Sequence, residues 1–389
     1  MRARFALTTL SLALLLCTAQ ASEPEWPAEY SAALDQIASA PRNDRALYQM
    51  QAGVIALDLG LNGEAARLFD AVLGSITAVY GNSESAARAR SYWQEEGGKD
   101  FKGEPYERAM AFYYRGLLDL MDGEYDNARA SFSGGQLQDA FAEDAQNQSD
   151  FASLSYLEGW CGKLMGSADL AEQSFADFAR LRPGMPLPKA EDNLLVLVET
   201  GLGPRKRADN VEGNALRYFR HPRSPEKRAE IVVGSSRFPL MPVEDVYWQA
   251  ATRGGRGIDR ILNGKLEFRQ TSATVGSALT GIASFAQEFA PIYEGNIGGA
   301  IAGVAAVGTA AQLLSFSTKT RADARYWNNL PEGLHVFTAR LPAGAKALPI
   351  QFLDANGVVD PSLTQFAPIH IDRKGNAVAW LRSRRATSR

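Results

Sequence analysis

One spacing of small and aromatic residues occurs three times in the first half of the chain. Counted from a first glycine, a second glycine follows at +7, an alanine at +12 and a phenylalanine at +16. Such repeats constrain a fold strongly, because each unit must bury its apolar face against the next one. The three copies are Gly53–Gly60–Ala65–Phe69, Gly116–Gly123–Ala128–Phe132 and Gly159–Gly166–Ala171–Phe175.

This spacing predicts helical hairpins. The second glycine falls where a first helix ends, and the alanine and phenylalanine lie one turn apart on a second helix. The first glycine lies where the two helices touch. Helices are expected over 28–38, 45–59 and 64–80, and Pro183 ends the third hairpin.

The pattern resembles tetratricopeptide repeats, which implies a stacked array with a concave surface for a partner protein. Such repeats have about 34 residues, but here the copies lie 63 and 43 residues apart, so the array contains insertions. The longer insertion, 81–104 with Trp93, is expected either on the binding face or as a solvated connector.

The second half of the chain loses the helical period. Leu194 to Thr200 reads as a buried strand, and a further strand is expected at Ile231 to Val233. A helix over 243–251 and a longer one over 266–290 follow. The strands 334–341 and 348–353 are expected to pair with each other, and 366–371 with 377–381, around a turn at 374–376.

The fold class is therefore predicted to be α+β and mostly α. The expected divisions are an export signal at 1–21, a repeat domain at 22–189 and a smaller α+β module at 190–389 containing a Gly-rich buried helix.

The first residues have the form of an export signal. Arg2 and Arg4 precede the apolar run Phe5 to Leu16, and Ala19-Gln20-Ala21 suits cleavage before Ser22. Leu16 stands before Cys17 where a lipid-anchored protein would have a small residue, which favours soluble export. Cleavage changes the net charge from −3 to −5, so nucleic-acid binding is not expected.

Two segments allow more than one interpretation. Residues 205–230 are rich in lysine and arginine and are predicted to be an irregular solvated loop, or else a surface for phosphate, anionic lipid or acidic glycan. Gly295 to Thr318 has no charge over 24 residues and spaces Gly295, Gly299 and Gly303 four apart. A close-packed buried helix is favoured there over membrane insertion or self-association.

Motifs of catalysis are scarce. The chain has no Gly-x-Ser-x-Gly or His-Glu-x-x-His, and His221, His335 and His370 are scattered. After cleavage, Cys161 is the one remaining cysteine, and its apolar setting predicts a buried residue. No enzyme, cofactor or metal site is predicted.

Two stretches of the second half resemble an uncharacterised group of exported bacterial tetratricopeptide-repeat proteins, many of them lipoproteins, often encoded near curli-secretion-like outer-membrane lipoproteins. They are ETGLGPRKR (199–207) and ADARYWNNLP (322–331). Asp323 and Arg325, two residues apart, cannot share one helix face, so one of them is expected to reach the β-module. The resembling positions are Gly201, Gly203, Pro204, Arg205, Lys206, Asp323, Arg325 and Trp327.

The resemblance implies a role in the cell envelope, in the periplasm or at the outer membrane. We expect a non-enzymatic scaffold that binds an envelope protein, with Tyr113, Tyr114, Tyr156 and Trp93 as its anchors. A membrane-inserting or self-assembling component using 295–318 is one alternative, and an envelope enzyme acting on glycan is another. The partner and the oligomeric state are not predicted.

Overall fold

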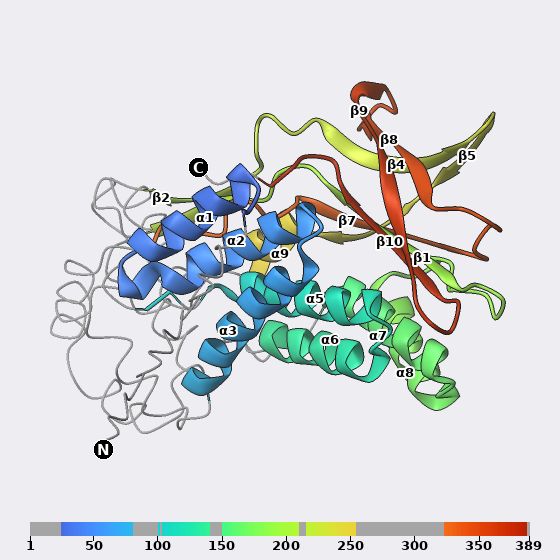
Figure 1. Cartoon of the computed structure of the whole chain (residues 1–389), viewed down its shortest axis with the longest axis horizontal. Helices are drawn as coiled ribbons and strands as arrows, with labels where there is room; N and C mark the ends of the chain where they lie inside the picture. Colours follow the sequence, from blue (N-terminus) through green and yellow to red (C-terminus); the bar gives the residue numbers. More distant parts are fainter. Residues whose placement is uncertain are drawn as a thin grey trace, which may run out of the picture.

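The chain folds into paired helices followed by a large mixed sheet, which is an α+β fold (Figure 1). The computed structural model describes residues 25–80, 100–101, 103–140, 150–209, 215–253 and 323–386. The helices of these ranges are α1 (Ala28–Ser39), α2 (Arg45–Asp58), α3 (Asn62–Tyr80), α5 (Pro105–Met121), α6 (Tyr125–Ala140), α7 (Ala152–Met165), α8 (Ala168–Leu181) and α9 (Val246–Arg253), with a 3-10 turn at Arg42–Asp44.

Three helical hairpins, α2–α3, α5–α6 and α7–α8, carry the repeated residues. In each hairpin the first glycine faces the repeat phenylalanine. A Cβ on Gly116 would lie 2.6 Å from Cε1 of Phe132, and the equivalent closest distances at Gly53 and Gly159 are 2.8 and 2.7 Å. These packing contacts are as the spacing predicts.

The second glycine of each copy ends the first helix. Gly60, Gly123 and Gly166 all have positive φ, at 73°, 77° and 73°. Side chains other than glycine rarely adopt this conformation, which lets the chain turn back into the second helix. The repeat alanines Ala65, Ala128 and Ala171 are buried where the helices approach.

The main sheet has eight strands in the order β5-β4-β8-β9-β10-β1-β7-β6. Its inner strand β1 pairs in parallel with β10 and antiparallel with β7. A separate hairpin is formed by β2 and β3. The strands are β1 (Leu194–Thr200), β2 (Arg205–Asp209), β3 (Ala215–Phe219), β4 (Glu226–Val233), β5 (Ser236–Pro239), β6 (Met241–Asp245), β7 (Gly333–Ala339), β8 (Ala347–Asp354), β9 (Val359–Ile371) and β10 (Ala377–Arg382).

Strand β1 is buried along its whole length because apolar side chains cover both of its faces. Leu195 and Leu197 belong to the core shared with the helices. Leu194, Val196 and Val198 belong to a second core, lined by β4, β8, β9 and β10. A continuous apolar run is typical of a strand covered on both faces.

The helices and the sheet share one hydrophobic core. It runs from Tyr30 in α1 through the three hairpins to residues of β1, β7 and β10, and to Ala386 near the C-terminus. In Figure 1 the helices gather on one side of the molecule and the main sheet on the other. The array is thus covered by the second half of the chain.

Two sequence-based expectations about the second half are wrong. Strand 334–341 does not pair with 348–353: β7 lies between β1 and β6, while β8 lies between β4 and β9. Residues 241–245 are a strand rather than the start of a helix, because they join the ladder beside β7, and α9 begins at Val246. The predicted pairing of β9 with β10 is confirmed.

Candidate functional site

The two stretches on which the family resemblance rests lie side by side. The N–H of Gly203 donates to the Leu330 carbonyl at 2.7 Å, and the N–H of Glu332 donates to the Thr200 carbonyl at 2.9 Å. A Cβ on Gly203 would stand 2.8 Å from the Leu330 oxygen, so only glycine permits this approach. Pro204, buried next to it, leads into β2.

The first stretch places Lys206 in a buried ionic contact with the array. Its ammonium lies 2.5 Å from Oε1 of Glu104, and Lys206 is almost completely buried. Glu107, the third residue of α5, accepts the N–H groups of Glu104 at 2.7 Å and Trp327 at 2.6 Å. The carboxylates at the start of α5 therefore hold both motif stretches.

Burial sets the ionisation of this contact. It raises the pKa of Glu107 to about 7, although the Lys206 charge acts against this change. Burial alone would lower the pKa of Lys206, but Glu104 and Glu107 outweigh it and the pKa is raised. The lysine therefore stays charged, while Glu107 titrates near neutral pH.

The second stretch places Trp327 and Arg325 against the helices. The Trp327 ring is fully buried, with its centroid 6.2 Å from that of Phe69 and 5.8 Å from that of Tyr114. The Arg325 guanidinium binds Asp323 at 2.7 Å and Asp44 at 2.5 Å. Asp323 and Arg325 therefore pair with each other, and Arg325 also reaches Asp44 just before α2. The expectation assumed a helix, but this segment is not helical.

A second buried carboxylate, Glu199, lies at the end of β1. It accepts hydrogen bonds from Tyr114 at 2.9 Å and from Trp380 at 3.0 Å, and it pairs with Arg382 at 3.2 Å. Burial raises its pKa, and the nearby Arg382 opposes that rise. Residues of α5, β1 and β10 thus meet at one charged contact inside the core.

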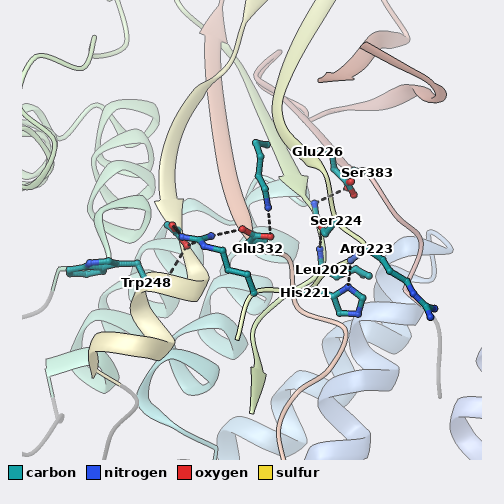
Figure 2. Close-up of polar contacts among 12 residues, drawn as sticks. Leu202, His221, Arg223, Ser224, Glu226, Trp248, Glu332 and Ser383 are labelled. Atoms are coloured by element: carbon teal, nitrogen blue, oxygen red, sulfur yellow. Dashed lines mark hydrogen bonds and ion pairs between the residues drawn. The ribbon is translucent and has the colours of Figure 1, made fainter. Parts of the chain in front are cut away.

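The basic stretch 220–228 forms a polar cluster around the loop that follows β1 (Figure 2). Arg220 and Lys227 both pair with Glu332, the latter at 2.6 Å.

On the other side of the cluster the Ser224 hydroxyl accepts the N–H of Leu202 at 2.8 Å. Glu226 accepts the hydroxyl of Ser383 and pairs with Arg384 at 2.5 Å. Gly201 has a φ of 74° here, and a Cβ on it would meet the Ser224 hydroxyl.

The prediction of an irregular solvated loop at 205–230 is wrong. Residues 205–209 and 215–219 pair as β2 and β3, β4 begins at Glu226, and Arg220 and Lys227 pair with Glu332. The composition of the stretch did not indicate these ion pairs, because Glu104, the partner of Lys206, and Glu332, the partner of Lys227, lie about a hundred residues away along the chain.

The tyrosines expected to anchor a partner lie in the core, which corrects that prediction. Tyr113, Tyr114 and Tyr156 are at most 1% exposed. Tyr114 contacts Glu199 of β1 and the Trp327 ring, and Tyr113 packs on Tyr114. The Tyr156 ring packs on Phe175 and Phe178 of its own hairpin. These side chains are therefore covered by the chain itself.

Of the four exposed large aromatic side chains in the described ranges, two lie close to the polar cluster. Phe219, at the end of β3, is 41% exposed, and Trp248, in α9, is 42% exposed. Figure 2 shows Trp248 extending away from the polar cluster. Helix α9 packs beside β3, and the Arg220 guanidinium lies 4.2 Å from the centre of the Tyr247 ring.

A further buried carboxylate, Glu244 of β6, joins the ends of the array to α9. It pairs with Arg182 at 3.1 Å and accepts the Gln249 amide at 3.0 Å and the N–H of Ser153 at 3.3 Å. Burial raises its pKa to about 8 in spite of Arg182. By contrast, burial lowers the pKa of His335 in β7 to about 4.

Several predicted sites lie outside the described residues: the export signal, Trp93, and the glycines Gly295, Gly299 and Gly303. In the described ranges no helix is long and apolar enough to cross a membrane. Within the same ranges no group of histidine, cysteine and acidic side chains could hold a metal ion. Cys161 is buried, as predicted, and burial raises the pKa of its thiol.

Comparison of the chain with protein-family models, with curated proteins and with solved structures finds no match. Its function must therefore be argued from the residues themselves.

Proposed function

We propose that the protein is an exported, non-enzymatic scaffold of the cell envelope that binds a partner protein. The Gly–Phe packing in three successive hairpins supports a tetratricopeptide-like array at its centre. In this proposal the array does not offer its inner face to the partner, because the chain's own second half covers that face. The array instead supports a docking surface made elsewhere.

The observation that carries the proposal is the exposed pair Phe219 and Trp248 beside arginine side chains. Tryptophan, tyrosine and arginine dominate the binding energy of protein interfaces. Arg207 lies over the Phe219 ring and Arg220 over Tyr247, so aromatic and cationic groups are interleaved. We name Phe219, Tyr247, Trp248, Arg207 and Arg220 the aromatic–arginine patch.

The buried charges support a structural role for the two motif stretches. Lys206, Arg325 and Arg382 are held by carboxylates of the same chain. The first two contacts join β2 and the Trp327 segment to the helical half, and the third joins β10 to β1. These residues position the patch relative to the array and do not themselves contact the partner.

Photo-crosslinking in intact cells tests the proposal. A photoreactive phenylalanine analogue replaces Phe219 or Trp248 in separate variants. The matched control is Phe238, which is 42% exposed but lies in β5 at the far end of the sheet. We expect one discrete protein adduct at positions 219 and 248 and none at 238. The same adduct at all three positions, or none at 219 and 248, would contradict the proposal.

A further inference from the structure

A proline-rich segment connects the last helix of the array to the first strand of the sheet. It comprises residues 183–190, PGMPLPKA, between α8 and β1. Near its start the N–H of Met185 donates to the Arg182 carbonyl at 3.3 Å, which closes a turn. Near its end the N–H of Lys189 donates to the Asp192 carboxylate at 2.9 Å. Both ends of the segment are therefore held in place by hydrogen bonds.

The prolines keep the middle of this segment extended. Pro186 and Pro188 each fix their own φ at about −65°. Each proline also keeps the residue before it, Met185 or Leu187, out of the helical region. Four successive residues are thus restricted to extended conformations of the polyproline II type, a helix of about three residues per turn without internal hydrogen bonds.

The burial of the segment follows this three-residue period. Met185 and Pro188 are half-buried, and Met185 packs against the main core. Pro186, Leu187 and Lys189 are exposed, Leu187 at 43%. One edge of the extended segment therefore lies against the protein, while its other two edges present a proline, a leucine and a lysine to the surroundings.

The exposed leucine distinguishes this segment from a plain connector. Prolines alone suffice to make a stiff spacer between two parts of a protein. An apolar side chain that a spacer holds in water adds nothing to the spacer, and its transfer out of water is favourable. Leu187 stands between two prolines that fix its direction, so its burial requires a second molecule.

We propose that residues 185–189 are a docking segment for a second protein, one whose binding groove is lined by aromatic side chains. Extended proline-rich segments bind in grooves of this kind, and a preformed conformation lowers the ordering cost of binding. Pro186 and Leu187 fill the groove. Lys189, on the same edge as Pro186, meets a carboxylate at one end of it.

This inference goes beyond the proposed function. It gives the scaffold a second contact surface, which does not depend on the aromatic–arginine patch. A chain with two such surfaces can hold two different proteins at the same time.

Photo-crosslinking of the full chain in intact cells tests the inference. A photoreactive phenylalanine analogue replaces the exposed Ala190, which the three-residue period places on the same edge as Leu187. We expect one discrete adduct with another protein. In Pro186→Ala/Leu187→Ala its yield should fall at least about tenfold, because the leucine no longer becomes buried in the groove.

Two further variants control this result. Leu170→Ala/Pro342→Ala makes the same two changes at an exposed leucine of α8 and an exposed proline after β7, and should leave the yield unchanged. Lys189→Glu alters no apolar contact, and its exposed side chain is not needed for folding. It should also lower the yield, because it reverses the charge that faces the carboxylate.

A synthetic peptide of residues 182–190 shows whether the extended segment itself is recognised. Polyproline II needs no tertiary contacts, so the free peptide can adopt the bound conformation. Added in excess to a cell lysate before irradiation, it should abolish the adduct at position 190. The same peptide with alanine at positions 186 and 187 should not.

Several results would overturn the inference. They are the absence of an adduct at position 190, an adduct that joins two copies of this chain, equal yield in Pro186→Ala/Leu187→Ala, equal yield in Lys189→Glu, and failure of the natural peptide to compete. Mass spectrometry of the crosslinked fragments identifies the other protein. A fragment of it without tryptophan, tyrosine or phenylalanine would contradict the aromatic groove.

The adducts at Phe219 and Trp248 keep this inference separate from the proposed function. Adducts at those two positions with none at 190 would leave the proposed function standing and overturn the docking segment. A proline-dependent adduct at 190 with none at 219 and 248 would support the docking segment and contradict the proposed function.

Discussion

The first glycine of each repeat has no side chain and so leaves room for the ring of the repeat phenylalanine. Gly116 is buried in α5 against Phe132, whose ring is itself fully buried, so an added methyl group would have to displace that ring within the core. Gly63 in α3 differs, because a Cβ there meets nothing within 4 Å. Two glycines in helices should therefore respond in opposite ways to the same added methyl group.

We expect Gly116→Ala to lower the free energy of unfolding by about 1–3 kcal/mol, the cost of overpacking a core. Gly63→Ala, the matched control, should raise it by about 0.5–1 kcal/mol, since alanine suits a helix better than glycine. Urea denaturation followed by circular dichroism measures both. Equal effects of the two substitutions would show that the Gly–Phe contact does not hold the hairpin.

Glu244 should make stability depend on pH. Its pKa is about 8 in the folded protein and 4.5 ordinarily, so between these values the folded state binds more protons than the unfolded state. The contribution of Glu244 to the free energy of unfolding therefore falls as pH rises from about 4.5 to 8, by at most about 1.4 kcal/mol per pH unit.

Urea denaturation of the unchanged chain and of Glu244→Gln, at a series of pH values from 5 to 9, isolates this contribution. The difference should shift steadily in favour of the variant as pH rises, because the amide stays neutral. His335 gives the opposite slope between pH 4 and 6.5, but it is present in both proteins and cancels. A difference that is constant with pH would show that Glu244 is charged throughout.

At the scale of elements, buried ion pairs connect segments that are far apart in the chain. Lys206 of β2 reaches Glu104 at the start of α5, and this contact fixes a hairpin that is separate from the main sheet. A two-stranded hairpin is marginally stable on its own. The position of this hairpin therefore depends on the buried Lys206.

We expect Lys206→Met to lower the free energy of unfolding by about 3–5 kcal/mol, because Glu104 and Glu107 lose their cation. The loss should be larger at pH 8 than at pH 5, since Glu107, with a pKa of about 7, becomes neutral at the lower pH. The neighbouring Arg205→Met, on the outer side of the hairpin, is the control and should change stability little. Equal effects of the two would mean that the Lys206–Glu104 contact does not anchor the hairpin.

Short-range sequence patterns correctly predicted the helical hairpins, strand β1 and one β-turn. The repeat spacing gave the hairpins, the apolar run gave β1, and Lys374-Gly375-Asn376 gave the turn between β9 and β10. The pairing of β7 could not be predicted in this way, because its neighbours β1 and β6 are distant in sequence.

The candidate site was predicted only in part, for a physical reason. The motif stretches 199–207 and 322–331 were singled out, and they do meet, but as a buried connection between halves of the molecule. An aromatic residue on a helix looks the same in sequence whether it faces a partner or its own sheet. Tyr113 and Tyr114 face the sheet, while the exposed Phe219 and Trp248 lie in segments with no distinctive pattern.

For the whole molecule, the core shared by array and sheet is the decisive feature. Tyr114 touches Glu199 of β1, Trp327 packs on Phe69 of α3, and Asp58 of α2 accepts the N–H of Ala386. The array therefore depends on the second half of the chain to cover its inner face. In the proposed function, the partner therefore binds the aromatic–arginine patch instead.

Denaturation of the full chain and of a fragment ending at residue 189, followed by tryptophan fluorescence and circular dichroism, tests whether the helical hairpins depend on the core that they share with the sheet. The shared core predicts a single coincident transition for the full chain, and a fragment that fails to unfold cooperatively because Tyr113, Tyr114 and Tyr156 lose their cover. A fragment with its own sharp transition, or two separate transitions in the full chain, would show an independent array with an open inner face and contradict the account.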